Sequence, residues 1–242
     1  MSKAGKRVAK RATAGKRATA AKRALGKRPT AKNRAAADRR ARSSKSRGAV
    51  RNPVFHHALL KTPRMQEMID WYQKVVGIEA VFQAPGIAFL SNDEANHRIS
   101  LAGGEHFRDN PEFRHYAGLH HLAFEYESID DLLDTWERLH REYGFEPHVA
   151  VHHGMTLSFY YVDPDGNSVE LQADVFGDWK KSKEWMRTSP QFRADPIGKF
   201  VDPAKMLAAR AAGVKEKELL RRAYAGEYAP AAPYDYRVDL PS

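Results

Sequence analysis

The most informative absence from this 242-residue sequence is cysteine, of which it has none. Disulfide bonds and zinc or iron–sulfur sites built on thiolates are therefore excluded. No apolar run approaches the roughly 18 residues that a transmembrane helix needs, and the first residues are charged and alanine-rich, unlike the apolar core of a signal peptide. We therefore expect a cytoplasmic protein that does not associate with membranes.

Acidic residues are almost missing from the start of the chain. Residues 1–52 contain 19 Lys and Arg but a single acid, Asp38, so this segment carries a charge of +18 and the rest of the chain −8. The Ala, Thr and Gly residues between these charges offer too little apolar surface to bury, so folding could not offset its entropy cost. A disordered tail is therefore predicted. The charge density would attract nucleic acid or another polyanion without sequence preference. A solvated arm and a transit peptide are the alternatives.

A repeated pattern of strand and helix begins after Pro53. The segments VFHHALLKT and GLHHLAFEY each precede an apolar stripe at helical spacing. Six pairs of matching residues, among them His57 and His121, share an offset of 64 positions. Three short extended segments follow each expected helix. The pattern predicts an α+β fold of two β-α-β-β-β modules, residues 53–104 and 118–174, that form a shared, open, barrel-like sheet.

The paired modules are expected to form one domain over residues 53–175. The remaining residues, 176–242, are predicted to be a C-terminal helical extension, with helices around 204–211 and near 215–223. No pattern in this extension indicates a second active site.

Side-chain alternation places three potential metal ligands on one face of the strands. In HHLAFEY the apolar residues alternate with His121, so His121 is predicted to point away from the helix, and the repeat places His57 on the same face. On the last strand Val169 and Leu171 are the apolar set, so Glu170 faces the two histidines. Two imidazoles and one carboxylate are typical of Fe(II) sites that keep positions open for substrate and O₂. The alternative is that all three are ordinary hydrogen-bonded or solvated residues.

The two histidine motifs and the segment FYYVDPDGNSVEL resemble the vicinal-oxygen-chelate (glyoxalase/bleomycin-resistance/dioxygenase) superfamily. More narrowly, they resemble its small type I extradiol ring-cleavage dioxygenases of the biphenyl-2,3-diol type. The resemblance implies that His57, His121 and Glu170 hold Fe(II), with Mn(II) or another divalent metal as the alternative. It also implies a homo-oligomeric enzyme that cleaves a catechol-type aromatic diol with O₂.

The resemblance implies roles for four further residues. His106, fifteen residues before His121, and Tyr160, ten residues before Glu170, would bind or orient the diol and O₂. His153 would be the acid/base, with His152 as the alternative. Two other functions remain open: another metal-dependent activity of the superfamily (lyase, isomerase or thiol transferase), and a non-catalytic protein that binds an aromatic ligand.

Overall fold

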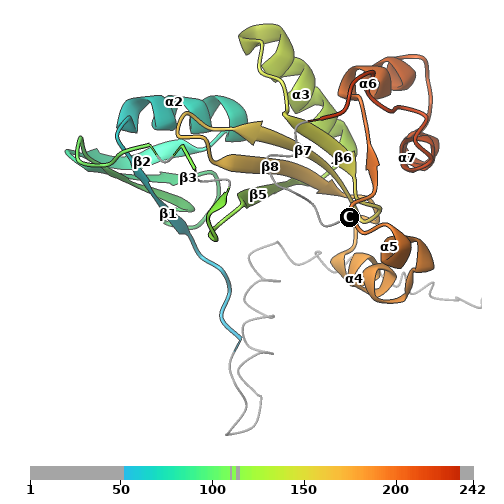
Figure 1. Cartoon of the computed structure of the whole chain (residues 1–242), viewed down its shortest axis with the longest axis horizontal. Coiled ribbons are helices and arrows are strands. Elements are labelled where there is room, and N and C mark those ends of the chain that lie inside the picture. Colours follow the sequence, from blue (N-terminus) through green and yellow to red (C-terminus); the bar gives the residue numbers. More distant parts are fainter. Residues whose placement is uncertain (1–51, 110, 113–114, 235–242) are drawn as a thin grey trace, which may run out of the picture. The chain divides into compact units, whose positions relative to one another are not determined.

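The computed structural model describes residues 52–109, 111–112 and 115–234. The basic tail predicted over residues 1–52 therefore lies, apart from its last residue, outside the described residues. The chain divides into two compact units, Met1–Val54 and Phe55–Ser242, and the described helices and strands belong to the second unit (Figure 1). Among the described helices, none has the length and apolar character required to cross a membrane.

The first half of this second unit is a strand, a helix and three strands. In chain order these are β1 (Ala58–Thr62), α2 (Met65–Val76), β2 (Glu79–Ala84), β3 (Ile87–Ser91) and β4 (Ile99–Gly103). They form a sheet in the order β1-β4-β3-β2, in which β1 and β4 are parallel and the other pairs are antiparallel. Helix α2 ends at Gly77, whose φ of 71° is a left-handed conformation that glycine adopts at little cost.

The second half repeats this order of elements. It contains β5 (His121–Tyr126), α3 (Ile129–Tyr143), β6 (Val149–His152), β7 (Thr156–Val162) and β8 (Ser168–Asp174). Helix α3 begins after Ser128, whose hydroxyl accepts a hydrogen bond from the Asp131 amide at 3.1 Å, the expected N-cap. The predicted mixed α+β fold is confirmed. Within the described residues its strands form two separately hydrogen-bonded sheets and no closed barrel.

The C-terminal extension contains more structure than the sequence predicts. Its elements are α4 (Trp179–Thr188), α5 (Pro190–Ala194), β9 (Lys199–Phe200), α6 (Pro203–Ala211) and α7 (Glu216–Tyr224). Helices α6 and α7 confirm the two predicted helices. Strand β9 has two residues, too few to show any periodicity, and it pairs antiparallel with β6, so the second sheet has the order β5-β8-β7-β6-β9.

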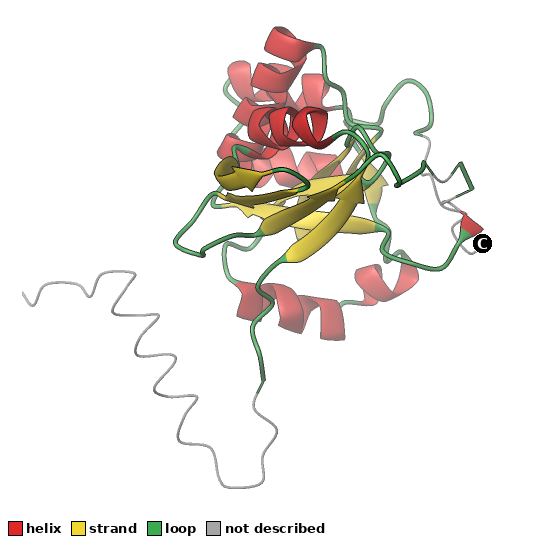
Figure 2. Cartoon of the chain, turned by 90° about the vertical axis from the view of Figure 1, so that its left-hand side faces the viewer, coloured by secondary structure: helices red, strands yellow, loops and turns green. Residues whose placement is uncertain are grey.

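The predicted apolar stripes are the buried faces of the two long helices. Helix α2 packs on β2 and β4, and α3 packs on β5, β8 and α6. One hydrophobic cluster joins both halves to the extension, with Tyr72, Leu132 and Met206 among its fully buried members. Figure 2 shows helices on both sides of the strands, so the sheets are covered from two directions.

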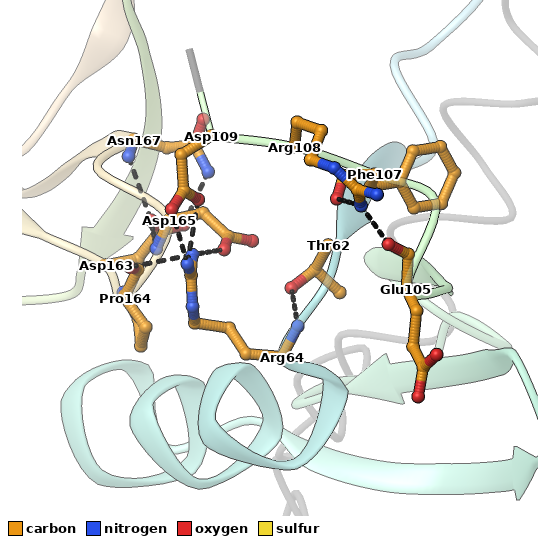
Figure 3. Close-up of polar contacts among 10 residues, drawn as sticks. All are labelled: Thr62, Arg64, Glu105, Phe107, Arg108, Asp109, Asp163, Pro164, Asp165 and Asn167. Carbon is orange, nitrogen blue, oxygen red and sulfur yellow. Dashed lines mark hydrogen bonds and ion pairs between the residues drawn. The ribbon is translucent and has the colours of Figure 1, made fainter. Parts of the chain in front are cut away.

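A polar network joins the start of α2 to the turn between β7 and β8 (Figure 3). The Arg64 guanidinium donates to the Pro164 carbonyl at 3.2 Å and forms an ion pair with Asp165. Its other terminal nitrogen donates to both carboxylate oxygens of Asp109, at 2.7 and 2.9 Å. One side chain therefore ties together three segments that are far apart in the sequence.

Asp163 organises that turn from a buried position, with 3% of its surface exposed. Its carboxylate accepts hydrogen bonds from the backbone amides of Asp165 (3.0 Å) and Asn167 (2.8 Å), and the buried Tyr72 hydroxyl donates to it at 3.3 Å. Burial raises the pKa of Asp163 to about 6. The folded protein therefore holds this proton more tightly than the unfolded chain does.

Replacing Asp163 with alanine is expected to lower the free energy of unfolding by about 2–3 kcal/mol, because buried donors lose their acceptor. Asp93→Ala is the matched control, since Asp93 lies at the equivalent turn of the first half but is 44% exposed, and it should cost less than about 1 kcal/mol. Because the folded pKa is raised, the stability that Asp163 contributes is greatest at low pH and declines as pH rises through about 6. Urea denaturation at about pH 5 and about pH 7.5 measures this decline. Equal losses of unfolding free energy in the two variants would contradict the organising role of Asp163.

Candidate active site

A cavity of about 230 Å³ lies against the second sheet. Its lining is rich in histidine and includes one residue of the C-terminal extension; the lining residues are His120, His121, His148, Val149, Val151, His153, Tyr160 and Ile197. Alternation along β6 and the residue that follows it explains part of this set, because positions 149, 151 and 153 point to one side. The cavity therefore combines imidazoles, a phenol and apolar walls.

His121 and Glu170 come together next to this cavity. Strands β5 and β8 are parallel neighbours, and His121 Nε2 lies 3.0 Å from a carboxylate oxygen of Glu170. Glu170 is only 5% exposed. Burial by itself raises the pKa of Glu170, but hydrogen bonds from His121, Ser158 and Tyr160 outweigh it and hold the pKa below its ordinary value. The carboxylate is therefore anionic at neutral pH.

This pair fits two positions of a divalent metal centre. Nitrogen and oxygen ligands lie about 2.0–2.2 Å from such an ion, so two of them at a right angle are about 3 Å apart. The observed separation of 3.0 Å matches that spacing. An imidazole beside an anionic carboxylate also suits a borderline metal such as Fe(II).

His57, the third ligand that the sequence predicts, lies in another group. Its Nδ1 is 3.1 Å from Nδ1 of His56, and its ring centroid is 4.3 Å from that of His97. In the part of the chain that the structure describes, His56, His57 and His97 form a group of potential metal ligands. Their donor nitrogen atoms all lie within 4.8 Å of one another. The structure thus brings together two of the three predicted ligands and groups the third with His56 and His97.

His153 and Tyr160 face each other inside the cavity. His153 Nδ1 lies 2.7 Å from the Ile197 carbonyl oxygen, and its Nε2 lies 3.1 Å from the Tyr160 hydroxyl. Because a carbonyl only accepts hydrogen bonds, we assign the proton to Nδ1, which leaves Nε2 as an acceptor. Burial lowers the pKa of His153, so the ring is neutral near pH 7. Burial and the Glu170 charge raise the pKa of Tyr160 well above its ordinary value.

His152 points to the other side of β6. Its Nδ1 accepts a hydrogen bond from the Gly154 amide at 3.0 Å, and its ring packs against Tyr224 of α7. Burial lowers the pKa of His152 to about 4. His152 lines a separate groove under α4 and α7, and it is not among the residues that line the cavity of His121 and His153.

The C-terminal extension holds His153 in place through a close backbone contact. Ile197, whose carbonyl binds the His153 ring, precedes Gly198. Gly198 has a φ of +91°, and a Cβ atom there would lie 2.1 Å from the carbonyl oxygen of His152. Only glycine allows the extension to approach β6 this closely.

His106 lies outside the cavity. It is exposed on the segment after β4, where its ring packs on Phe107 with centroids 4.1 Å apart. Sequence reasoning missed five of the lining residues: His120, His148, Val149, Val151 and Ile197. The HH doublet is the sequence signal for His120, because it places a second histidine next to the predicted ligand His121. In the structure the Nδ1 atoms of the two residues are 2.7 Å apart. No sequence pattern marks Ile197, which reaches the cavity through tertiary packing.

Comparisons with known proteins show which family this chain resembles in sequence. Residues 54–171 match the model of the Glyoxalase/Bleomycin resistance protein/Dioxygenase superfamily. The chain is 37% identical over 181 residues to biphenyl-2,3-diol 1,2-dioxygenase 2 of Rhodococcus globerulus, a match covering 75% of this chain and 94% of that protein. It is 39% identical over 173 residues to biphenyl-2,3-diol 1,2-dioxygenase 3 of the same organism, covering 72% of this chain and 90% of the relative. The chain therefore belongs to the glyoxalase/bleomycin resistance protein/dioxygenase superfamily.

Proposed function

We propose that this protein is an Fe(II)-dependent extradiol dioxygenase that cleaves a catechol-type aromatic diol with O₂. The observation that carries the proposal is the His121–Glu170 pair beside a cavity that also contains a neutral His153 and Tyr160. Two relatives that bear the name biphenyl-2,3-diol 1,2-dioxygenase support the reaction class.

His57, His121 and Glu170 would hold the metal, with Mn(II) as the alternative ion. This assignment requires the His57 ring to give up its contacts with His56 and His97. When bound, Fe(II) supplies Lewis-acid and redox chemistry toward the diol and O₂. The anionic Glu170 would neutralise part of the charge of the cation. The ligand set contains no thiolate, which agrees with a chain that has no cysteine.

The remaining cavity residues bind the diol and move its protons. The unprotonated Nε2 atom of His153, which lies 3.1 Å from the Tyr160 hydroxyl, can instead take a proton from a diol hydroxyl and later return it. Tyr160, whose raised pKa keeps it protonated, has a single hydroxyl proton, which it would turn from Glu170 or His153 to an oxygen of the bound diol. The apolar side chains of Val149, Val151 and Ile197 pack against the aromatic ring and exclude water.

The proposal is tested by loading metal-stripped protein with Fe(II) under anaerobic conditions and adding 2,3-dihydroxybiphenyl or catechol in air. Oxygen uptake in step with loss of the diol, together with a yellow product, is the expected result. Protein without metal should take up no oxygen. Stoichiometric iron binding without oxygen uptake on any diol would move the assignment to a lyase, isomerase or transferase. Binding of the diol without any metal would indicate an aromatic-ligand binding protein.

A further inference from the structure

Three histidine side chains meet at one end of the first sheet, at the open edge where β1 begins. His56 and His57 precede β1, and His97 lies just before β4. The parallel pairing of these strands, which begins with Ala58 opposite Ile99, sets the two preceding segments side by side. We call His56, His57 and His97 the three-histidine cluster.

Two nitrogen atoms of the three-histidine cluster have the spacing of ligands around one ion, and the third histidine offers a nitrogen close to both. Nitrogens bound about 2.0–2.1 Å from a metal lie roughly 3.0–3.4 Å apart, depending on the geometry. The Nδ1 atoms of His56 and His57 are 3.1 Å apart, and all three residues offer a nitrogen within 4.8 Å of the others. Two of the rings are exposed and His97 is half-buried, so an ion can reach them from solvent.

The surrounding charges permit a cation at this cluster. Arg98 is the nearby basic residue, and it donates to the His56 carbonyl at 3.0 Å. Its guanidinium also forms three hydrogen bonds with the Asp93 carboxylate, at 2.7, 3.0 and 3.2 Å, and this carboxylate neutralises its charge. No carboxylate or thiolate belongs to the cluster as the structure describes it. Imidazole-only sites favour Zn²⁺, Ni²⁺ or Cu²⁺ over Mg²⁺ and Ca²⁺, which require oxygen ligands.

We propose that the three-histidine cluster is a second metal site, specific for borderline divalent cations such as Ni²⁺ and Zn²⁺. Because it shares His57 with the catalytic centre, an ion bound here withdraws that ligand and inhibits turnover. The inhibitory part rests on the proposed dioxygenase function, whereas the binding part does not. His97 belongs to the second site alone.

Binding is tested on untagged, metal-stripped protein carrying His121→Gln and Glu170→Gln, which removes the two other ligands of the catalytic centre. Calorimetric titration with Ni²⁺ should show one equivalent bound. Adding His97→Gln should weaken this binding by at least about tenfold. Adding His115→Gln instead is the matched control, because His115 is an exposed histidine whose ring contacts Glu112. If the double variant does not fold, the same series is run on Glu170→Gln alone.

Inhibition is tested on the Fe(II)-loaded protein without those two substitutions. Ni²⁺ should inhibit oxygen uptake, and His97→Gln should raise the inhibitory concentration about tenfold or more while leaving kcat without Ni²⁺ unchanged. Unchanged Ni²⁺ binding in the His97 variant would overturn the site. Loss of binding with unchanged inhibition would overturn the competition for His57. Failure of the Fe(II)-loaded protein to take up oxygen would overturn the proposed function, while the titration still decides whether the second site exists.

Discussion

Glu170→Gln is expected to reduce Fe(II)-dependent oxygen uptake at least about 100-fold, because even residues one shell outside a metal cost 10- to 100-fold when lost. The amide keeps the size of the side chain and can still accept the hydrogen bond from His121, so the fold should survive. It removes the negative charge that the hydrogen bonds of His121, Ser158 and Tyr160 stabilise. Bound iron per chain and the rate of oxygen uptake measure the two effects.

Glu146→Gln is the matched control for this prediction. Glu146 also pairs with a histidine, His140, and accepts a hydrogen bond from the Trp136 indole at 3.2 Å, but it lies outside the cavity lining. Its replacement should leave both iron content and oxygen uptake near those of the wild type. Equal losses in the two variants would indicate a general effect on folding and contradict the role of Glu170.

The variants His153→Gln and His152→Gln are expected to have different effects, one on kcat and the other on stability, although the two residues are neighbours. His153→Gln removes the proton acceptor that faces Tyr160, so kcat should fall about 10²- to 10⁴-fold. His152→Gln lies on the far side of β6 and should leave kcat near that of the wild type, while the free energy of unfolding falls by about 1–3 kcal/mol. Steady-state kinetics and urea denaturation of both variants separate these outcomes. A larger kcat loss in His152→Gln would reverse the assignment.

Gly198→Ala tests whether the C-terminal extension positions His153. The new Cβ would collide with the His152 carbonyl, so Ile197 must move and release the His153 ring. We expect a lower kcat with little change in iron content. Gly213→Ala is the control, because Gly213 has a similar φ of +90° but no atom of the described residues lies within 4 Å of the place that its Cβ would take. It therefore carries the same backbone strain without the collision, and an equal loss of kcat in both variants would contradict the positioning role.

Local patterns in the sequence were sufficient for the repeated order of elements. The apolar stripes of α2 and α3 and the stop residues Gly77 and Gly144 depend on neighbours within a few positions. The mixed α+β fold and the helices α6 and α7 follow from the same signals. Alternation also predicted that Glu170 and His121 would face each other, although no local signal reports their separation.

Contacts between distant segments decided the rest of the site. His152 and His153 are both candidates by residue type and spacing. The structure separates them because His152 ends β6 and His153 directly follows it, and successive side chains of an extended segment point to opposite faces. Ile197 reaches His153 across 44 positions through β9, an element too short to leave a periodic signal. The sequence places His57 on the first strand, facing His121 and Glu170, whereas in the structure it lies one residue before β1, and the pairing of β1 with β4 brings His97 beside it. The sequence by itself determined which elements form and which residue types could bind a metal, because these depend on short-range periodicity; only the tertiary structure decided which of those residues meet, because that depends on long-range packing.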